Sequence, residues 1–593
     1  MAPRKRTTTP SKPSAPRTTA IPASNGHGLK PKDKAPAAPL TDRIVRQVRI
    51  VIRVFVLITL VAMGWSKLFG KRQLSQVEQN KAQVMGVSSR LEPIEANVAR
   101  RDAVLDAFKH SYSAYERDAF GKDHYHPISH KGSDMSLKGP VGYFVIDTLD
   151  SLLLMGLDDE FQRAHKWVKD LSFDIDDKLH HFEITIRVLG GLLSAYHMSG
   201  NDTVFLERAV DLADRLLPAF DTPTGLPYSF VNLAQRKGIP DPDNRGWTSI
   251  AEAGTLQLEM RYLSELTGNP IYWQKAEKVI DIIRKLKSKD GLVPIFVSPQ
   301  SGDFVMSEIR LGSRGDSYYE YLLKQYLQTN RVDRVFKDMH DKAMSGIKRH
   351  LLKTSVTENL LYTSELHPRR KREDGQLYFQ DVPKQDHLVC FLGGLFMLGV
   401  TEGTGPVPPL ESTFIEAQAD DFYAGKGLIR GCMDTYASTR TGLAPEIANW
   451  FLDTKDAHET KRDWYVISRI EGSDVPPIDA RNILRPELVE SLFVAYRITG
   501  DRMYREWGWA IFKAFEKHCK LPAGGFASIL DVDELPVRHE DRMETFWLSE
   551  TLKYLYLLFS DADVLPLDKY VFNTEAHPLP VFTPGPASRC SLT

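Results

Sequence analysis

The chain has 593 residues, of which 42% are hydrophobic and 26% charged, and 76 basic against 77 acidic side chains leave a formal net charge of −1. This is the composition of a globular protein, and the near balance of charge gives no reason to expect a nucleic-acid partner. Length alone leaves the number of domains open.

The first 42 residues are basic and rich in Pro, Ser, Thr and Ala. Such a segment cannot bury enough apolar surface to offset its chain entropy. Residues 1–42 are therefore predicted to be a disordered tail.

An apolar stretch follows, and its uninterrupted part runs from Val54 to Trp65. A spanning helix needs ~20 residues, so Arg53 would have to reach the interface. The arginines on the N-terminal side favour a signal anchor over residues 43–66, with the tail cytosolic and the rest lumenal. A buried core helix is the alternative, whereas a cleaved signal peptide fits poorly because the region before it is long. Residues 67–94 are interpreted as a lumenal stalk.

Two further features depend on that location. The sequon that begins at Asn201 predicts a glycan only if this part of the chain is lumenal. Spacing does not choose among the three full pairings of the four cysteines, which are Cys390, Cys432, Cys519 and Cys590.

A helical hairpin recurs along the remaining chain with a period of about sixty residues. In each copy an apolar helix ends at a turn beside Gly or Asn, and a second helix follows. The four clear turns lie at Ser199, Thr267, Thr329 and Thr499. The length after the stalk accommodates roughly seven or eight such hairpins.

The two helices of a hairpin differ in character. From Phe182 to Met198 apolar residues occupy nearly the whole circumference, which indicates a helix buried on all sides. The next segment, residues 203–217, is amphipathic. An inner ring of buried helices inside an outer amphipathic ring is an αα barrel, and a closed ring needs no capping repeats.

Charged residues interrupt these buried helices. Glu183 and Arg187 lie four apart on one face, and a structural ion pair is the simplest explanation for one such pair. The pattern recurs at Arg485, Glu487 and Glu490; at Arg314, Asp316 and Glu320; at Glu252 and Glu259; at Phe546 and Glu550; and at Asp147 and Asp150. Because these groups lie near the starts of the inner helices, they are expected to meet at one mouth of the barrel.

A cavity lined by carboxylates, arginines and aromatics suits a neutral, polyhydroxylated ligand. Two carboxyl groups in different environments are the minimal equipment for glycoside hydrolysis. So many acids would repel one another, and calcium is the natural cation to join them.

From Arg100 to Phe582 the chain resembles the class I α-1,2-mannosidases, glycoside hydrolase family 47. The resemblance rests on FEITIRVLGGLLSAYHMSG, LGSRGDSYYEYLLKQYL, QDHLVCFLGG, STRTGLAPE, LRPELVESLF and FNTEAHP, in the family order. It implies an all-α (αα)7 barrel of helical hairpins over residues 95–585, with 586–593 as a C-terminal tail.

The resemblance also implies roles for single residues. Glu183 matches the general acid, Glu487 the general base, and Asp316 a rival or assistant for one of these roles. Thr574 matches the side chain that binds Ca²⁺ directly. Positions matching the mannose pocket are Arg187, Glu252, Asp386, His387, Arg485, Glu490, Phe546, Glu550 and Glu575. Without the resemblance, His387 would be interpreted as a core histidine.

The family disulfide falls on Cys390 and Cys432, which leaves Cys519 and Cys590 free. Arg314 resembles the endoplasmic reticulum type, which removes one mannose from the nine-mannose glycan, whereas the Golgi type carries an apolar residue there and removes several.

The expected partners are high-mannose N-glycans on glycoproteins and, through the anchor, the membrane of the endoplasmic reticulum or the Golgi. The catalytic domain is expected to be monomeric. A non-catalytic glycan-binding relative is an alternative, but no expected acid is missing. An unrelated helical-barrel hydrolase or cyclase is a further alternative, which FNTEAHP argues against.

Overall fold

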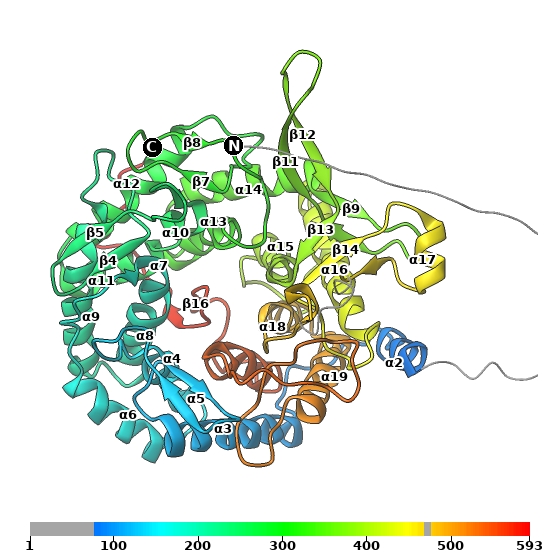
Figure 1. The fold of residues 1–593 in the computed structure, drawn as a ribbon, viewed down its shortest axis with the longest axis horizontal. Helices are drawn as coiled ribbons and strands as arrows, with labels where there is room; N and C mark the ends of the chain where they lie inside the picture. The colour runs from blue at the N-terminus through cyan, green and yellow to red at the C-terminus, as the bar shows by residue number, and fades with distance from the viewer. Residues whose placement is uncertain (1–75, 468–475, 593) are drawn as a thin grey trace, which may run out of the picture. The chain divides into compact units, whose positions relative to one another are not determined.

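Seven pairs of helices follow one another around a ring in the computed structural model, which describes residues 76–467 and 476–592 (Figure 1). One helix of each pair also contacts the corresponding helices of the neighbouring pairs, and these inner helices close the ring. The first helix of the ring (Val98–Ala119) pairs with the last one (Leu552–Leu558).

The outer helices are amphipathic, as α9 illustrates. Its buried residues are Phe205, Ala209, Leu212, Ala213 and Leu216, which follow the helical period along one face. The outer helices are α3 (Val98–Ala119), α6 (Asp158–Asp170), α9 (Thr203–Leu216), α12 (Ile271–Lys285), α14 (Arg334–His350), α16 (Glu416–Ala437) and α19 (Arg502–His518).

The inner helices are buried nearly all round. In α13 every residue from Ser317 to Gln328 is buried. The inner elements are α4 (Tyr143–Asp147), α5 (Leu149–Leu154), α7 (His181–Glu183), η1 (Ile184–Leu189), α8 (Gly190–Met198), α10 (Ile250–Gly254), α11 (Gln257–Thr267), α13 (Asp316–Gln328), η3 (His387–Phe391), α15 (Leu392–Thr401), α18 (Glu487–Thr499), η6 (Trp547–Thr551) and α20 (Leu552–Leu558).

The four predicted hairpin turns are confirmed. Gly268 and Gly500 end α11 and α18 in the left-handed conformation, at φ 69° and 67°. Asp202 and Asp501 then cap α9 and α19 through their side chains. The helical class of the fold is thus confirmed.

Short antiparallel strands, which the sequence analysis did not predict, fill the loops. They are β1 (His124–His126), β2 (Lys131–Ser133), β3 (Leu179–His180), β4 (Phe230–Asn232), β5 (Lys237–Ile239), β6 (Thr248–Ser249), β7 (Phe296–Val297), β8 (Phe304–Val305), β9 (Leu352–Thr354), β10 (Leu361–Thr363), β11 (Glu365–Arg370), β12 (Leu377–Val382), β13 (Lys384–Asp386), β14 (Ile447–Trp450), β15 (Trp464–Tyr465), β16 (Tyr570–Phe572) and β17 (Pro578–Pro580). Figure 1 shows the β11–β12 hairpin projecting from the ring and β16 inside it.

The described part of the predicted stalk, residues 76–94, contacts the helical ring. Helix α2 (Gln76–Met85) contacts α16 and α19, and Lys81 forms an ion pair of 2.9 Å with the buried Asp434. Trp507 donates its ring N–H to the carbonyl of Val84. Residues 76–92 are therefore part of the folded unit rather than a free spacer.

The predicted tail (1–42) and anchor (43–66) lie outside the described residues. Among residues 76–467 and 476–592, no helix combines the length and apolarity needed to cross a bilayer.

Candidate active site

One pocket collects most of the predicted site residues. It encloses about 1690 Å³ of empty space, its open mouth included. The first residues of α13 and α18 and the last residue of α7 contribute to its lining. The predicted residues that line it are Glu183, Arg187, Glu252, Arg314, Asp316, Glu320, Arg485, Glu487, Glu490, Phe546, Glu550, Thr574 and Glu575.

Glu183 faces the pocket with 32% of its side chain exposed. Its Oε2 accepts hydrogen bonds of 3.0 Å from the Tyr143 hydroxyl and from Nε of Arg187. Burial opposes ionisation, but the charges of Arg187 and His180 lower the pKa of Glu183 below its ordinary value. Glu183 is therefore a carboxylate when the pocket holds no substrate.

Glu487 has a separate partner for each carboxylate oxygen. Arg485 donates to Oε1 over 3.3 Å, and Nδ1 of His387 lies 2.6 Å from Oε2. Burial opposes ionisation here too, but Arg485 and the hydrogen bond with His387 lower the pKa of Glu487. An ionised carboxylate held by two donors has the charge state of a general base.

Asp316 differs from both of these acids. Burial raises its pKa to about 7, against the hydrogen bond from the Ser317 backbone, and the carboxylates of Glu320, Asp386 and Glu487 raise it further. At neutral pH a large fraction of Asp316 is therefore protonated. Carboxyl groups whose pKa values are pushed apart are what acid and base catalysis in one pocket requires.

Arg314 lies at the exposed rim of the pocket. Its backbone adopts φ 77°, which is uncommon for a residue with a side chain. The guanidinium lies 5.0 Å from the centre of the Phe296 ring, a cation–π distance. This places a stacked, charged donor where a ligand would enter.

A more buried group of carboxylates lines the same pocket. Lys324 forms ion pairs with Glu320 and Glu490. Burial, and then the charge of Glu575, raise the pKa of Glu550 well above its ordinary value. Burial also raises the pKa of Glu575 to about 8, although Arg187 opposes this. Both shifts favour the protonated, uncharged form of these two acids at neutral pH.

Thr574 lies beside these acids, in the turn between β16 and β17. A hydroxyl and a carbonyl oxygen are ligands that a hard cation such as Ca²⁺ prefers. A divalent cation here would stabilise the ionised forms of Glu550 and Glu575 and so lower their pKa values. The residues fit calcium bound directly by Thr574, with the carboxylates acting through water. Within 76–467 and 476–592, His, Cys, Asp and Glu side chains form no cluster of three that could hold a metal alone.

Predicted site residues that do not line the pocket lie behind its wall: Asp147, Asp150, Glu259, Asp386 and His387. His577 is bonded to Asp147 over 3.1 Å and to Asp150 over 2.7 Å, and Lys553 pairs with Asp150 over 2.8 Å. Although burial opposes it, the charge of Asp150 raises the pKa of His577 to about 9. These groups neutralise one another as a buried network.

The remaining three hold site residues in place. Glu259 accepts from Tyr321 over 2.7 Å and from Asn573 in the turn before Thr574. Asp386 accepts from the Ser313 backbone over 3.2 Å, next to Arg314. His387 contacts Oε2 of Glu487 through Nδ1.

Some lining residues were not predicted. His180 bonds to Glu252 over 3.1 Å, and Tyr143 bonds to Glu183. Glu544 lines the pocket with Arg542, which donates to it over 3.1 Å. The only signal for His180 was its place two residues before the FEITIR segment, and nothing in the pattern marked Tyr143.

The disulfide implied by the resemblance is present, with Cys390 and Cys432 joined and their Cα atoms 5.9 Å apart. Cys519 and Cys590 are free. Asn201 is exposed in the turn between α8 and α9.

Sequence comparisons of the chain with known proteins all lead to one family. The sequence model of glycosyl hydrolase family 47 matches residues 107–581. A mannosyl-oligosaccharide 1,2-alpha-mannosidase of Candida albicans is 46% identical over 495 residues, covering 81% of this chain and 83% of the relative. An endoplasmic reticulum mannosyl-oligosaccharide 1,2-alpha-mannosidase of Saccharomyces cerevisiae is 41% identical over 522 residues, covering 83% of this chain and 92% of the relative.

A solved structure agrees with these sequence matches. An alpha-1,2-mannosidase from Trichoderma reesei has a TM-score of 0.72 to this chain at 30% identity, and the match covers 82% of this chain and 100% of that one.

Proposed function

The chain belongs to glycosyl hydrolase family 47, and we propose that it removes terminal α-1,2-linked mannose from high-mannose N-glycans by direct attack of water. Relatives in Candida albicans and Saccharomyces cerevisiae are named mannosyl-oligosaccharide 1,2-alpha-mannosidases. The observation that carries the proposal is the meeting of three acids in one pocket, with Glu183 and Glu487 ionised and Asp316 largely able to hold a proton.

Glu487 is the proposed general base. It is ionised in the free enzyme and fixed at both oxygens, so it can orient a water molecule and take its proton during attack on the sugar. Attack by water rather than by a carboxylate inverts the configuration at the anomeric carbon.

Two carboxyl groups compete for the role of proton donor. Glu183 is the family match, but Arg187 keeps it ionised in the free enzyme. Asp316, with a pKa of about 7, is protonated in a large fraction of molecules at neutral pH. We therefore assign the proton to Asp316, and to Glu183 the orientation of a water or sugar hydroxyl beside the leaving oxygen.

Calcium is proposed as the resident ion, supported by the fit of Thr574 and its neighbouring acids. When bound, it supplies a hard positive charge that attracts sugar hydroxyls and water. The chain's own contribution there is a wall of acids, Glu320, Glu490, Glu550 and Glu575, that can hold those waters.

Removal of a single mannose is the proposed outcome, because Arg314 can hold one glycan branch in a fixed register. A Golgi-type enzyme that trims several mannoses remains the second candidate. A non-catalytic glycan-binding protein is not favoured, since none of the three acids is missing.

The proposed architecture is an (αα)7 barrel over about residues 95–585, supported by the pairing of inner and outer helices. The proposed location is the membrane of the endoplasmic reticulum, with residues 43–66 as a type II anchor and a monomeric, lumenal catalytic domain. Relatives named as endoplasmic reticulum enzymes support the compartment, and a glycan at the exposed Asn201 would require the lumen.

Glu487→Gln tests the proposal in the detergent-solubilised full chain. The variant should bind nine-mannose glycan with an affinity close to wild type but release mannose about 10²–10⁴-fold more slowly, the usual contribution of a general base. Binding without turnover by the wild type would favour the glycan-binding alternative instead.

A further inference from the structure

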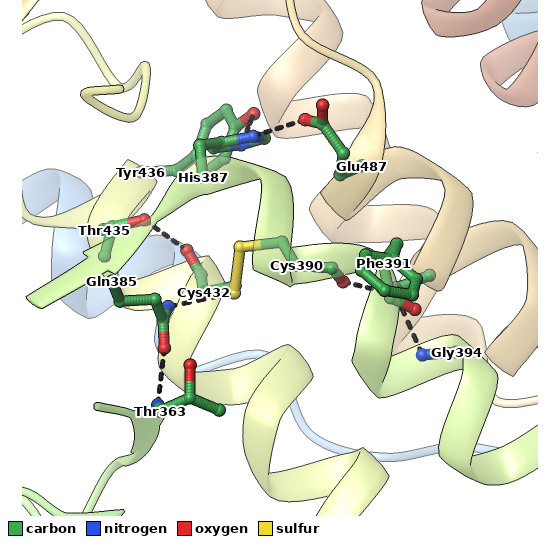
Figure 2. The surroundings of a disulfide bond; sticks show 11 residues. Thr363, Gln385, His387, Cys390, Phe391, Gly394, Cys432, Thr435, Tyr436 and Glu487 are labelled. Atoms are coloured by element: carbon green, nitrogen blue, oxygen red, sulfur yellow. Dashed lines mark hydrogen bonds and ion pairs between the residues drawn. A yellow bond between two sulfur atoms is a disulfide. The ribbon is translucent and has the colours of Figure 1, made fainter. Parts of the chain in front are cut away.

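Tyr436 forms the far end of a chain of hydrogen bonds that leads to Glu487. It lies on the last turn of α16 and its side chain is completely buried. Its hydroxyl lies 2.8 Å from Nε2 of His387, and Nδ1 of that ring lies 2.6 Å from Oε2 of Glu487 (Figure 2). Tyr436 does not line the pocket, and His387 is the residue that links its hydroxyl to Glu487.

The weak acidity of the phenol makes Tyr436 a hydrogen-bond donor in this chain. Burial, and then the nearby Glu487 and Glu446 carboxylates, raise the pKa of Tyr436 well above its ordinary value. Tyr436 therefore remains a hydroxyl and can donate to Nε2. A neutral imidazole that accepts at Nε2 carries its hydrogen on Nδ1, which is the atom that faces Glu487.

A covalent link connects the two elements that carry this pair. His387 begins η3, and Cys390 follows three residues later in the same element. Cys432 precedes Tyr436 by about one turn of α16. The Cys390–Cys432 disulfide thus joins η3 to α16 beside the point where the rings of His387 and Tyr436 meet edge to face, 5.5 Å apart (Figure 2).

We propose that Tyr436 is a positioning residue for the general base: by donating to Nε2 it fixes the tautomer of His387 that directs an N–H at Glu487. The proposal rests on the proposed function, in which Glu487 is the base. Without the hydroxyl, the imidazole can place its hydrogen on Nε2 instead and turn a lone pair toward the carboxylate.

The expected consequence is a base that is harder to ionise. Other groups also act on its charge, so the shift should be partial. The charged and titratable groups that face Glu487 are Arg485, His387, Tyr436, Asp316, Glu490 and Glu550. Arg485 donates to the other oxygen, a bond that a change at Tyr436 should leave in place.

Tyr436→Phe in the full chain is the direct test, with Thr435→Val as the matched control. Thr435 is the preceding residue of the same helix, and its hydroxyl bonds to the Cys432 carbonyl rather than to His387. For Tyr436→Phe we expect kcat on nine-mannose glycan to fall about tenfold with KM within about twofold of wild type, a fraction of what loss of the base itself would cost. The acid limb of the kcat/KM profile should move to higher pH, whereas Thr435→Val should leave this limb unchanged.

A double-mutant cycle separates positioning from packing. In a His387→Ala background, Tyr436→Phe should have little further effect on kcat, because the bond it removes no longer exists. If Tyr436→Phe does not fold, 3-fluorotyrosine at position 436 replaces it as the test. Its stronger hydroxyl donor should move the acid limb to lower pH.

Three results would overturn the proposal: an unchanged acid limb in both Tyr436 variants, equal losses in Tyr436→Phe and Thr435→Val, or additive losses in the cycle. Failure of the proposed function itself would look different, because the wild-type chain would then release no mannose.

Discussion

Nε of Arg187 lies 3.0 Å from Oε2 of Glu183, the residue one helical turn earlier in the chain. The same guanidinium pairs with Glu575 through Nη1, so it joins the acid that matches the family's proton donor to the acids beside Thr574. Because Arg187 stabilises the ionised form of Glu183, the proton needed for departure of the leaving group is more readily held by Asp316.

Asp316→Asn tests this assignment through the pH profile. In wild type, activity should decline above about pH 7 as Asp316 loses its proton. The variant should lose kcat by about 10²–10⁴-fold, and its residual activity should lack the alkaline limb. Retention of that limb in Asp316→Asn, together with its loss in Glu183→Gln, would return the role of acid to Glu183.

The same substitution has a predicted effect on stability. The pKa of Asp316 is raised to about 7 in the folded chain from an ordinary value of 3.8, so its contribution to stability is fully present below about pH 4 and is lost as the pH rises through 7. In Asp316→Asn the side chain cannot ionise, so stability is no longer lost at this position as the pH rises. The variant should be more stable than wild type by about 1–3 kcal/mol at pH 8, with the difference shrinking toward pH 4. Denaturant unfolding at both pH values measures it, and a difference independent of pH would contradict the raised pKa.

Calcium removal should lower thermal stability as well as activity. An ion that binds only the folded chain stabilises it by mass action, so the melting temperature should rise with calcium concentration and fall with chelator. Thr574→Val should weaken this dependence. Thr499→Val is the control, because Thr499 is a buried threonine outside the pocket whose hydroxyl donates to the Ala495 carbonyl and accepts from the Asp501 backbone N–H. A Thr574 variant whose melting temperature responds to calcium as wild type does would exclude Thr574 as a direct ligand.

Arg314→Leu should change which mannoses are removed. Loss of the guanidinium at the rim should slow release of the preferred mannose and speed release of other α-1,2-linked ones, since specificity is a difference between affinities. Arg245→Leu is the matched control, an exposed arginine over Trp247 at 5.5 Å that does not line the pocket. Product profiles from nine-mannose glycan measure the effect. Identical profiles for wild type and Arg314→Leu would remove the support for the endoplasmic reticulum type.

Lys81→Ala tests whether the segment before the helical ring belongs to the folded unit. Asp434 is completely buried and also accepts from Trp464 and Ser438, so loss of Lys81 leaves its charge without a cation. We expect a loss of about 1–3 kcal/mol in the free energy of unfolding. Lys461→Ala, which breaks an exposed pair with Glu78, should cost less than about 1 kcal/mol. Equal effects of the two substitutions would show that α2 is a passive spacer.

The ring of helix pairs was predictable because its cause lies in local sequence. A segment such as Phe182–Met198, with apolar residues around nearly its whole circumference, must be buried, and the amphipathic helix after it must cover it. The strands in the loops were not predictable, since segments of two or three residues such as β6 carry no periodic signal and form only when the ring brings them together.

The site was predictable in kind but not in every position. Glu252 and Glu259 were expected on one face of a continuous helix. The helix is interrupted between Gly254 and Gln257. As a result Glu252 lines the pocket, whereas Glu259 is buried behind its wall. Tyr436 carried no signal at all, because its role depends on contact with His387, a residue distant in sequence.

The configuration of the first mannose released tests the account most directly. Nine-mannose glycan is incubated with the full chain, and the anomeric proton of free mannose is followed by NMR before mutarotation. Attack by a water bound to Glu487 predicts β-mannose as the first product, together with an eight-mannose glycan. Release of α-mannose first would mean a covalent intermediate and retention, and would contradict the assignment of Glu487 as a base that activates water.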